Sequence, residues 1–530
     1  MSIDPERWPA LHPFLFGLFP VLFFFSQNAG QLDYGDMMIP TLFAVGLTTL
    51  CLTVGRVIYG SWRKGAIVAS LAVVLFFSYG HIWNLISRAT VFGIKTRHDY
   101  LLPLWAGLFV TGVYMVFRTQ RELRGVTGFL NVAAASMVTM SLLTLGLYEY
   151  NLHEPSEAQN SSSFEYSELD SVDSVNVEYD EAPDIYYIIP DAYASSSTLY
   201  NLYGYDNGSF LSSLEDYGFT VYRNSISNYS QTQLSVSSSM NMSYLKYMRV
   251  ETNQSAINKI KKNKITRTLK EHKYEVHSFD SGLGLTRSLE DSNVHCKGWW
   301  GNTHLGSSFI RTTIFGPIFY RLNLYGRYEK KINCALKNIK NVGENSNRPK
   351  FVFVHLMSPH PPWTFDSDGS KIFPVGSIST PESLENKEHY LSELEYISGM
   401  IESVIEDIKN EDDRKKVIII QSDHGTKANG RGHKATSAMN FPPSDTLIKA
   451  RMGILNAYHL PGCSDRIYEG ITPVNSFRVV FNCYFDTDLD MLPDKSYFSS
   501  YDSPFDFEDV TERARWEPVE QDSTVRETSN

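Results

Sequence analysis

Cysteine is scarce in this sequence, with five among 530 residues, and no two of them form a CxxC pair. Structural zinc sites usually group cysteines at such short spacings, so we expect no zinc site built on cysteines. Basic charge is also in deficit: 48 lysines and arginines stand against 59 acidic residues, which gives a net charge of −11. Because a basic stripe with interleaved aromatic residues is missing as well, we expect no nucleic-acid partner.

The five cysteines fall in two settings. Cys51 lies in an apolar run, where it is expected only to pack. The other four occur in the polar part of the chain, where an oxidising compartment would favour the local pairs Cys296 with Cys334 and Cys463 with Cys483. Four cysteines allow three pairings, and four unrelated buried thiols are the alternative.

Long apolar segments fill the first part of the chain. Five of them are long and apolar enough to cross a hydrocarbon layer of about 30 Å. They cover residues 11–26, 37–59, 65–85, 101–117 and 128–147. The first could be a cleaved signal peptide, but no small-residue cleavage site clearly follows it and four further segments come after. We therefore predict a transmembrane domain of five helices over residues 1–150.

The charges of the connecting loops predict the orientation of these helices. The loop after the first segment carries two aspartates and no basic residue, so it should lie outside. The loop between the third and fourth segments is basic and opposes the pattern. The two loops that should be cytoplasmic carry Arg56, Arg63, Lys64, Arg118, Arg121 and Arg124. Five spans with an inner N-terminus place everything after residue 148 outside the cytoplasm.

Three regions of different composition follow the apolar segments. Residues 151–182 are rich in Ser, Glu and Asp and cannot bury enough apolar surface to fold alone, so they should form a linker. Residues 183–510 alternate short β-rich runs with helical patterns, which predicts an α/β sandwich. The charged residues 511–530 should be a disordered tail. The most apolar runs, expected to be central strands, are Asp184–Pro190, 351–355 (FVFVH) and 417–421 (VIIIQ).

Polar residues of metal-binding type follow these three runs. Asp191 follows the first, Ser358 and His360 follow the second in HLMSPHPPW, and Asp423 and His424 follow the third in QSDHG. In open α/β sheets, ligands bind beyond the carboxyl ends of the strands. One Asp-His pair would be weak evidence, but three strand ends that carry such residues predict a metal site at one edge of the sheet.

A nucleophile could come from residues 228–245 (NYSQTQLSVSSSMNMSYL), which offer Thr232, Ser235 and Ser237–Ser239. The segment is typical of a turn that opens a helix, where free backbone N–H groups and the helix dipole favour an anionic phosphate. A Ser/Thr-rich helix cap without a catalytic role is the alternative reading of the same spacing.

With these motifs the sequence resembles the alkaline phosphatase/sulfatase superfamily. It resembles most the bacterial membrane branch of lipoteichoic acid synthases and lipid A phosphoethanolamine transferases. The likeness covers essentially the whole chain and rests on five spans before the α/β domain, an acidic residue after its first strand, a Thr at a Ser/Thr-rich helix start, H-x-x-x-PH and SDHG. SDHG after an apolar strand is the most specific of these features.

The resemblance implies a role for each motif residue. Thr232 would be the nucleophile that forms a phospho-enzyme and would complete a shell around Zn²⁺ or Mn²⁺. The other implied metal ligands are Asp191, Asp423 and His424. His360 and His433 (in GRGHK) would hold the head group or protonate the leaving oxygen.

The implied reaction moves a phosphoethanolamine- or phosphoglycerol-type group from a phospholipid donor to an envelope glycan or lipid acceptor. The implied place is the bacterial inner membrane, with the catalytic domain in the periplasm.

Two departures from the family pattern bear on the substrate. The transferases usually have Glu where this chain has Asp191, and Asp is the choice of sulfatases. The sulfatase C/S-x-P-x-R signature is missing, because SVSSSM contains neither Pro nor Arg. A membrane-bound sulfatase-like or phosphodiester hydrolase is therefore an alternative, and a non-catalytic envelope-assembly protein is another.

The orientation is testable with reporter fusions. A reporter joined after residue 150 should be active only if it is one that works outside the cytoplasm, because the loop charges place this point outside. Activity of a cytoplasm-dependent reporter at the same junction would contradict the orientation and remove the case for an envelope substrate.

Overall fold

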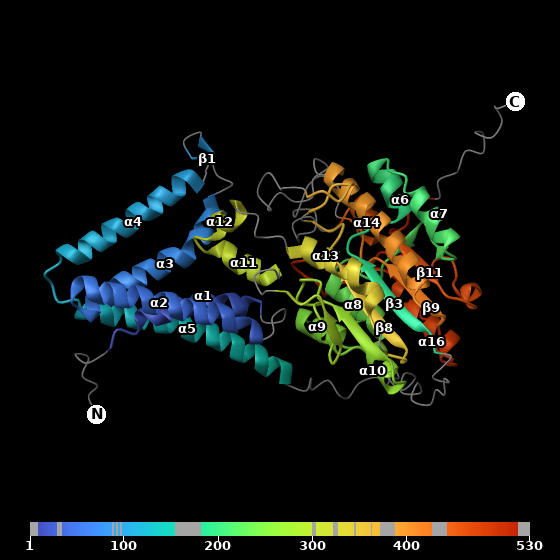
Figure 1. The fold of residues 1–530 in the computed structure, drawn as a ribbon, viewed down its shortest axis with the longest axis horizontal. Helices are drawn as coiled ribbons and strands as arrows, with labels where there is room; N and C mark the ends of the chain where they lie inside the picture. Colours follow the sequence, from blue (N-terminus) through green and yellow to red (C-terminus); the bar gives the residue numbers. More distant parts are fainter. Residues whose placement is uncertain are drawn as a thin grey trace. The chain divides into compact units, whose positions relative to one another are not determined.

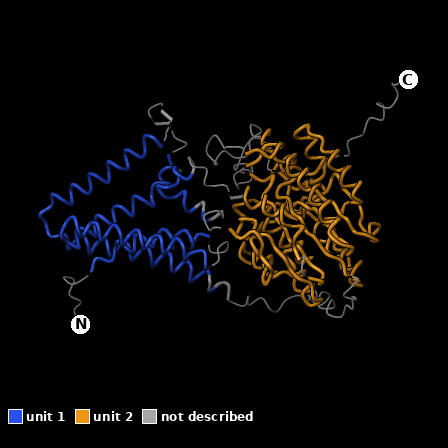
Figure 2. Tube along the Cα trace, in the orientation of Figure 1, with its two compact units in different colours: residues 1–161, 299–327 blue, residues 162–298, 328–530 orange. Residues whose placement is uncertain are grey.

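The chain forms two compact units, which Figure 2 shows in different colours. One comprises residues 1–161 and 299–327, and the other comprises residues 162–298 and 328–530. The computed structural model describes residues 9–28, 34–86, 90–91, 94–95, 98–153, 182–298, 304–321, 327–343, 346–361, 363–371, 387–426 and 442–517.

The membrane unit contains five apolar N-terminal helices, as predicted (Figure 1). They are α1 (His12–Gln27), α2 (Met38–Tyr59), α3 (Trp62–Ile86), α4 (His98–Arg118) and α5 (Arg124–His153). By length and composition, α2 to α5 can each cross a membrane, whereas α1 is a shorter apolar helix of 16 residues. A hairpin of β1 (Thr90–Val91) and β2 (Ile94–Lys95) lies between α3 and α4.

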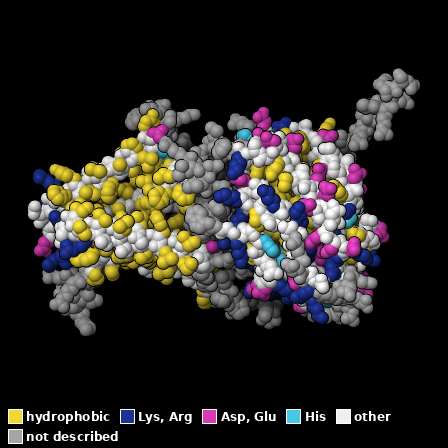
Figure 3. Space-filling model, in the orientation of Figure 1, with side chains coloured by type: hydrophobic (Ala, Val, Ile, Leu, Met, Phe, Trp, Pro, Cys, Tyr) yellow, Lys and Arg dark blue, Asp and Glu magenta, His cyan; other side chains and the backbone are white. Residues whose placement is uncertain are grey.

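The surface of these helices is apolar. In the view of Figure 3, hydrophobic side chains cover most of the membrane unit, whereas charged side chains are spread over the other unit. Leu42, Val57 and Phe129 are among the large apolar residues that are exposed there. Water would penalise such a surface and lipid would not, so the helices suit a bilayer.

A buried asparagine shows that α1 and α5 run in the same direction. Near the start of α5, the Asn131 side-chain oxygen accepts hydrogen bonds from the backbone N–H groups of Leu11 and His12, at 3.0 and 2.8 Å. Asn131 thereby satisfies donors that every helix leaves free in its first turn. If five helices cross a membrane in alternating directions, the first and the fifth must run in the same direction, as α1 and α5 do.

The second unit is built on a seven-stranded sheet with the order β4-β11-β9-β3-β8-β6-β7. The neighbours from β9 to β7 are parallel, and β11 and β4 pair antiparallel at one side. The strands are β3 (Asp184–Pro190), β4 (Thr220–Val221), β6 (Glu275–Phe279), β7 (Asn293–His295), β8 (Lys350–Leu356), β9 (Lys416–Gln421) and β11 (Asn456–His459).

Helices cover both faces of this sheet, because alternate residues of a strand point to opposite faces. On β3, Tyr186 and Ile188 pack into one core, and Ile185 and Tyr187 pack into the other. The first core also includes side chains of α7 (Gly208–Asp216), α13 (Arg327–Asn338) and α14 (Lys387–Lys409). The second includes α8 (Thr232–Asn241), α9 (Asn253–Lys261), α10 (Lys264–Glu271) and α16 (Pro473–Tyr484). The predicted α/β sandwich is confirmed.

Smaller elements complete this unit. A third apolar cluster includes side chains of α15 (Asp445–Met452) and of the end of the described chain. The remaining elements of this unit include α6 (Ser196–Thr198), α15 (Asp445–Met452), the pair β5 (Ser225–Ile226) and β10 (Gly453–Ile454), and the pair β12 (Tyr497–Phe498) and β13 (Glu508–Asp509).

Both predicted local disulfides are present. Cys296 joins Cys334 and Cys463 joins Cys483, with Cα–Cα distances of 5.9 and 6.4 Å. Cys51 is a free cysteine on α2.

The predicted domain boundaries need two corrections. Residues 299–327 belong to the membrane unit and therefore interrupt the domain predicted for residues 183–510. The tail predicted to begin at residue 511 is docked as far as residue 517: Ala514 lies in an apolar cluster, and the Trp516 indole N–H donates to Thr198 Oγ1 at 2.9 Å. The charged composition of residues 511–530 gave no indication of the contacts made by Ala514 and Trp516. Most of the predicted linker, residues 154–181, and residues 518–530 lie outside the described residues.

Truncation separates the docked part of the C-terminus from the rest. Deleting residues 521–530 should leave the melting temperature unchanged. Deleting residues 511–530 should lower stability by roughly 1–3 kcal/mol, because it exposes the apolar cluster that includes Ala514 and removes the Trp516 hydrogen bond. Thermal unfolding of both truncated proteins in detergent is the measurement, and equal melting temperatures would contradict the docking.

Candidate metal-dependent active site

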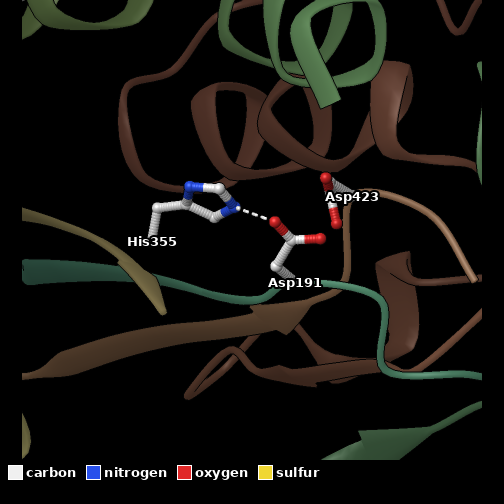
Figure 4. Close-up of side chains that lie close together, drawn as sticks. All are labelled: Asp191, His355 and Asp423. Carbon is white, nitrogen blue, oxygen red and sulfur yellow. Dashed lines mark ion pairs between the residues drawn. The ribbon is translucent and has the colours of Figure 1, made fainter. Parts of the chain in front are cut away.

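Three parallel strands bring acidic and imidazole side chains to one edge of the sheet. Asp191 follows the last residue of β3, His355 is the penultimate residue of β8, and Asp423 lies two residues beyond β9. Each offers one ligand atom, and these three atoms lie within 4.8 Å of one another (Figure 4). All three side chains are buried. The parallel register of β9, β3 and β8 creates this cluster, because it aligns their carboxyl ends.

His424 joins the cluster from the next position along the chain. Its Nε2 lies 3.3 Å from Asp423 Oδ2 and 3.6 Å from Asp191 Oδ1. On the other side of Asp191, His355 Nε2 lies 3.5 Å from Oδ2 (Figure 4). The carboxylate of Asp191 therefore lies between two imidazole rings.

Both rings are oriented through their other nitrogen. His424 Nδ1 lies 3.0 Å from the carbonyl oxygen of Gly425, which can only accept, so Nδ1 carries the proton and the lone pair is on Nε2. His355 Nδ1 lies 2.6 Å from the hydroxyl oxygen of Thr286. Burial lowers the pKa of His355, which favours the neutral ring. Partners of this kind hold metal-binding histidines in position.

Thr232 is the first residue of α8 and points its hydroxyl at this cluster. Its Oγ1 lies 3.1 Å from His424 Nε2. The preceding residue, Gln231, is extended, and its side-chain amide donates to Ser499 and Ser500 oxygens, which fixes the start of the helix. The partly exposed hydroxyl thus stands where the helix dipole and free N–H groups favour an anion.

Gly425 is required by close backbone contacts. A Cβ at this position would lie 2.2 Å from the carbonyl oxygen of Ala450 and 2.3 Å from that of Gly453. The Gly425 N–H donates to the Arg451 carbonyl oxygen at 2.7 Å. These contacts explain the glycine of SDHG, because only a residue without a side chain lets the turn carry Asp423 and His424 to the cluster.

The buried guanidinium of Arg451 links the two halves of the site. It donates to the carbonyl oxygen of Ser230 at 2.6 Å, to that of Gly425 at 3.2 Å, and to the Tyr501 hydroxyl at 2.9 Å. Ser230 precedes the start of α8, and Gly425 follows Asp423 and His424. Arg451 therefore positions the Thr232 segment against the SDHG turn.

His360 lies beside the cluster on a partly exposed turn. Its ring centroid is 6.3 Å from that of His424, and its Nδ1 lies 2.6 Å from the Pro361 carbonyl oxygen. Glu393 of α14 fixes the conformation of this turn. Its carboxyl oxygens accept hydrogen bonds from the Ser358 hydroxyl at 2.8 Å and from the Thr364 N–H at 2.6 Å.

The structure thus brings together four residues that the sequence predicted as metal ligands or nucleophile: Asp191, Thr232, Asp423 and His424. His360 is near them, whereas His433 lies outside the described residues. The roles of all six stay predictions. His355 was missed, although it stands at the end of the apolar run FVFVH. A polar residue in the last positions of a buried strand is the signal that could have found it.

The cluster fits a divalent cation. Within the part of the chain that the structure describes, His355 Nε2 and Asp423 Oδ2 are buried and make no hydrogen bond. Two buried carboxylates repel each other by about 3–4 kcal/mol at an effective dielectric constant of 20. A cation would offset this repulsion and give His355 Nε2 and Asp423 Oδ2 a partner. Mixed carboxylate, imidazole and hydroxyl donors suit Zn²⁺ or Mn²⁺ better than Ca²⁺, without deciding between the two.

Comparison with known proteins identifies the family. The family model described as Sulfatase matches residues 183–448, half of the chain. The chain therefore belongs to the sulfatase family, and it is an enzyme of the alkaline phosphatase/sulfatase superfamily with a membrane domain. No curated protein matches it.

Several solved structures are similar in fold. The integral membrane lipooligosaccharide phosphoethanolamine transferase A from Neisseria meningitidis matches over 90% of this chain and 96% of its own, at 12% identity and a TM-score of 0.37. The C-terminal periplasmic domain of EptC from Escherichia coli matches over 61% of this chain and 93% of its own, at 14% identity and a TM-score of 0.38. The corresponding domain of the phosphoethanolamine transferase EptC from Campylobacter jejuni matches over 59% and 92%, at 11% identity and a TM-score of 0.37.

The turn that carries His360 should make stability depend on pH. Burial raises the pKa of Glu393 to about 8, against the lowering effect of the hydrogen bonds that it accepts. A carboxyl whose pKa is raised on folding binds its proton more tightly in the folded state. Its contribution to stability is therefore full below about pH 4.5 and is lost as the pH rises towards 8.

The test is the melting temperature between pH 5 and 8.5 for the native protein and for Glu393→Gln, which keeps the acceptor oxygen. The native protein should lose up to a few kcal/mol of stability over this range, and the variant should lose less. Parallel curves for the two proteins would show that Glu393 is ionised in the folded state.

Proposed function

We propose that the protein is a membrane-bound, metal-dependent transferase. It moves a phosphoethanolamine- or phosphoglycerol-type group from a phospholipid donor to an envelope glycan or lipid acceptor, through a phospho-Thr232 intermediate. The proposed metal ligands are Asp191, Thr232, Asp423 and His424, around Zn²⁺ or Mn²⁺. The proposed location is the bacterial inner membrane, with the catalytic unit in the periplasm.

One observation carries this proposal: the Thr232 hydroxyl, at the start of α8, lies 3.1 Å from His424 Nε2 beside two buried carboxylates. A threonine hydroxyl is a weak nucleophile at its ordinary pKa and needs activation. A bound divalent cation would supply that activation by lowering the pKa of the hydroxyl and offsetting charge on the phosphoryl oxygens.

The chain's own residues then account for two displacements. Thr232 loses its proton to water, its Oγ1 forms a bond to phosphorus, and the bond from phosphorus to the alcohol oxygen of the donor breaks. His360 or His433 gives that oxygen a proton. In the second displacement the acceptor alcohol gives its proton to the same histidine and bonds to phosphorus. The bond from phosphorus to Thr232 Oγ1 breaks, and Thr232 takes a proton back from water.

The membrane unit supports a lipid donor. A soluble substrate would need no helices in the bilayer beyond a simple anchor. Among the residues that the structure describes, four helices are long and apolar enough to cross the bilayer, and a fifth is shorter. A lipid donor lies in the same bilayer that anchors the chain, so the catalytic unit could bind the donor without the lipid leaving the membrane. The missing formylglycine signature near Thr232 further favours phosphate over sulfate esters.

Hydrolysis is the second candidate function, and Asp191 favours it. The transferases that the sequence resembles usually have Glu at this position, one methylene longer, and sulfatases have Asp. In a phosphodiester or sulfate-ester hydrolase, water would take the place of the acceptor alcohol in the second displacement. The same site geometry serves both reactions.

Mass spectrometry of the protein after incubation with a phospholipid donor tests the nucleophile. The native protein should carry a phosphoryl adduct on Thr232. Thr232→Ala should lose the adduct and turnover but keep much of its metal, because a hydroxyl is the weakest of the proposed ligands. Ser235→Ala, one turn further along α8, is the matched control and should keep the adduct. An adduct on Ser235, or full activity of Thr232→Ala, would refute the assignment.

The acceptor step and the histidines are tested in the same assay. Release of the adduct only when a glycan or lipid acceptor is added indicates transfer, and release in water alone indicates hydrolysis. His433→Ala should keep metal and adduct site but slow turnover by roughly 10²–10⁴. An unchanged rate in this variant would remove His433 from the mechanism.

A further inference from the structure

A short segment of the polar half of the chain folds as part of the membrane unit. It contains α11 (His304–Thr312) and α12 (Gly316–Arg321), and we call residues 304–321 the docking segment. In the sequence it lies between β7 and α13, both of which belong to the other unit. The chain therefore leaves the catalytic unit, packs against the membrane helices, and returns.

Aromatic side chains hold the docking segment against three membrane helices. Phe309 is buried, with its ring centroid 5.5 Å from that of Phe24 on α1 and 5.9 Å from that of Phe77 on α3. Phe315 lies edge-on to Phe76 at 5.0 Å. Val21 of α1, Ala44 of α2 and Val73 of α3 complete this apolar cluster. Aromatic pairs of this geometry add to the burial of apolar area.

The backbones also approach each other closely. The Ile314 N–H donates to the Phe76 carbonyl oxygen at 2.9 Å. A Cβ at Gly80 of α3 would lie 1.9 Å from the Arg311 carbonyl oxygen and 2.6 Å from Thr312 Cα. Because these are backbone atoms, no side-chain rotation could relieve the clash. Gly80 is thus the residue that lets the segment lie directly on α3. Figure 1 shows α11 next to α3.

The contacts lie at one end of the helix bundle. They involve the last third of α1 and the last half of α3, together with the start of α2. With the predicted orientation, this end of the bundle faces outward. Phe315 and Ile318 remain exposed on the segment, as expected for an amphipathic element at the interface between lipid and water.

We propose that the docking segment is a second, non-covalent membrane attachment of the catalytic half, independent of the linker between α5 and β3. The attachment is protein-to-protein: its partner is the outer end of α1, α2 and α3, with lipid covering only the remaining apolar side. The consequence is that the catalytic half stays at the membrane when the linker is cut.

The experiment uses the full chain with a recognition site for a sequence-specific protease placed within residues 154–181. Membranes containing this protein are treated with the protease and sedimented, and the catalytic fragment is followed in pellet and supernatant. In the otherwise native chain, the cut fragment should remain in the pellet. Its release into the supernatant on cutting would overturn the proposal.

Two variants test whether the described contacts provide the attachment. Gly80→Leu should raise the ratio of cut fragment in the supernatant to that in the pellet by about tenfold or more, because the close backbone contact is lost. Gly46→Leu on α2 is the matched control, since a Cβ there meets nothing within 4 Å, and it should behave like the native chain.

The double variant Phe309→Ala/Phe315→Ala changes no residue of the five membrane helices. It therefore distinguishes loss of docking from a folding defect that Gly80→Leu could cause in α3. It should release the cut fragment as Gly80→Leu does, while the uncut protein stays in the pellet. Retention of the cut fragment in both variants would show that lipid contact alone, and not the helix bundle, holds the segment, and would overturn the proposal.

Discussion

The arrangement of the catalytic unit depends on keeping two carboxylates, Asp191 and Asp423, buried side by side. Like charges that share a desolvated site cannot both stay ionised unless a cation or a proton compensates them. Here the flanking groups are imidazoles whose Nδ1 atoms are already engaged, so that Nε2 is directed to the carboxylates. This combination is what a metal site requires, and a simple ion pair would not need it.

Three other features of the fold position the residues of this cluster. The parallel register aligns three strand ends, Gly425 lets the SDHG turn pass against the backbone of Ala450, and Arg451 connects that turn to the start of α8. The opposite edge of the sheet shows the contrast. There Asp184 is compensated by lysines of the neighbouring strands, with Lys416 at 3.1 Å and Lys350 at 3.8 Å. The buried charge at that edge is compensated by the chain itself.

Much of this could be predicted from the sequence because the patterns are local. Apolar runs of the right length predicted the five membrane helices and the central strands, and polar residues just after those strands predicted Asp191, Asp423 and His424. His355 escaped because it is inside a strand, where only the pleat and the pairing of β8 with β3 decide which way it points. Glu393 and Arg451 escaped for a similar reason: their roles come from tertiary contacts with turns far away in the sequence.

The docking segment shows another limit of local patterns. Residues 304–321 are too short and too polar to stand out as a membrane element, and only their packing on α1, α2 and α3 assigns them to the membrane unit. The membrane unit is therefore completed by residues that come more than a hundred positions after its last long helix. Part of the polar half of the sequence is thus folded into the membrane unit.

A bound divalent cation should stabilise the Asp191–Asp423 pair, and the most direct measurement is metal content together with chelator-dependent stability. The purified protein should contain at least one tightly bound Zn²⁺ or Mn²⁺ per chain, and its melting temperature should fall when a chelator removes it. The variant Asp191→Asn/Asp423→Asn should bind no such ion and should melt at the same temperature with and without chelator. A metal-free native protein whose melting is unaffected by chelator and by added metal would contradict the account.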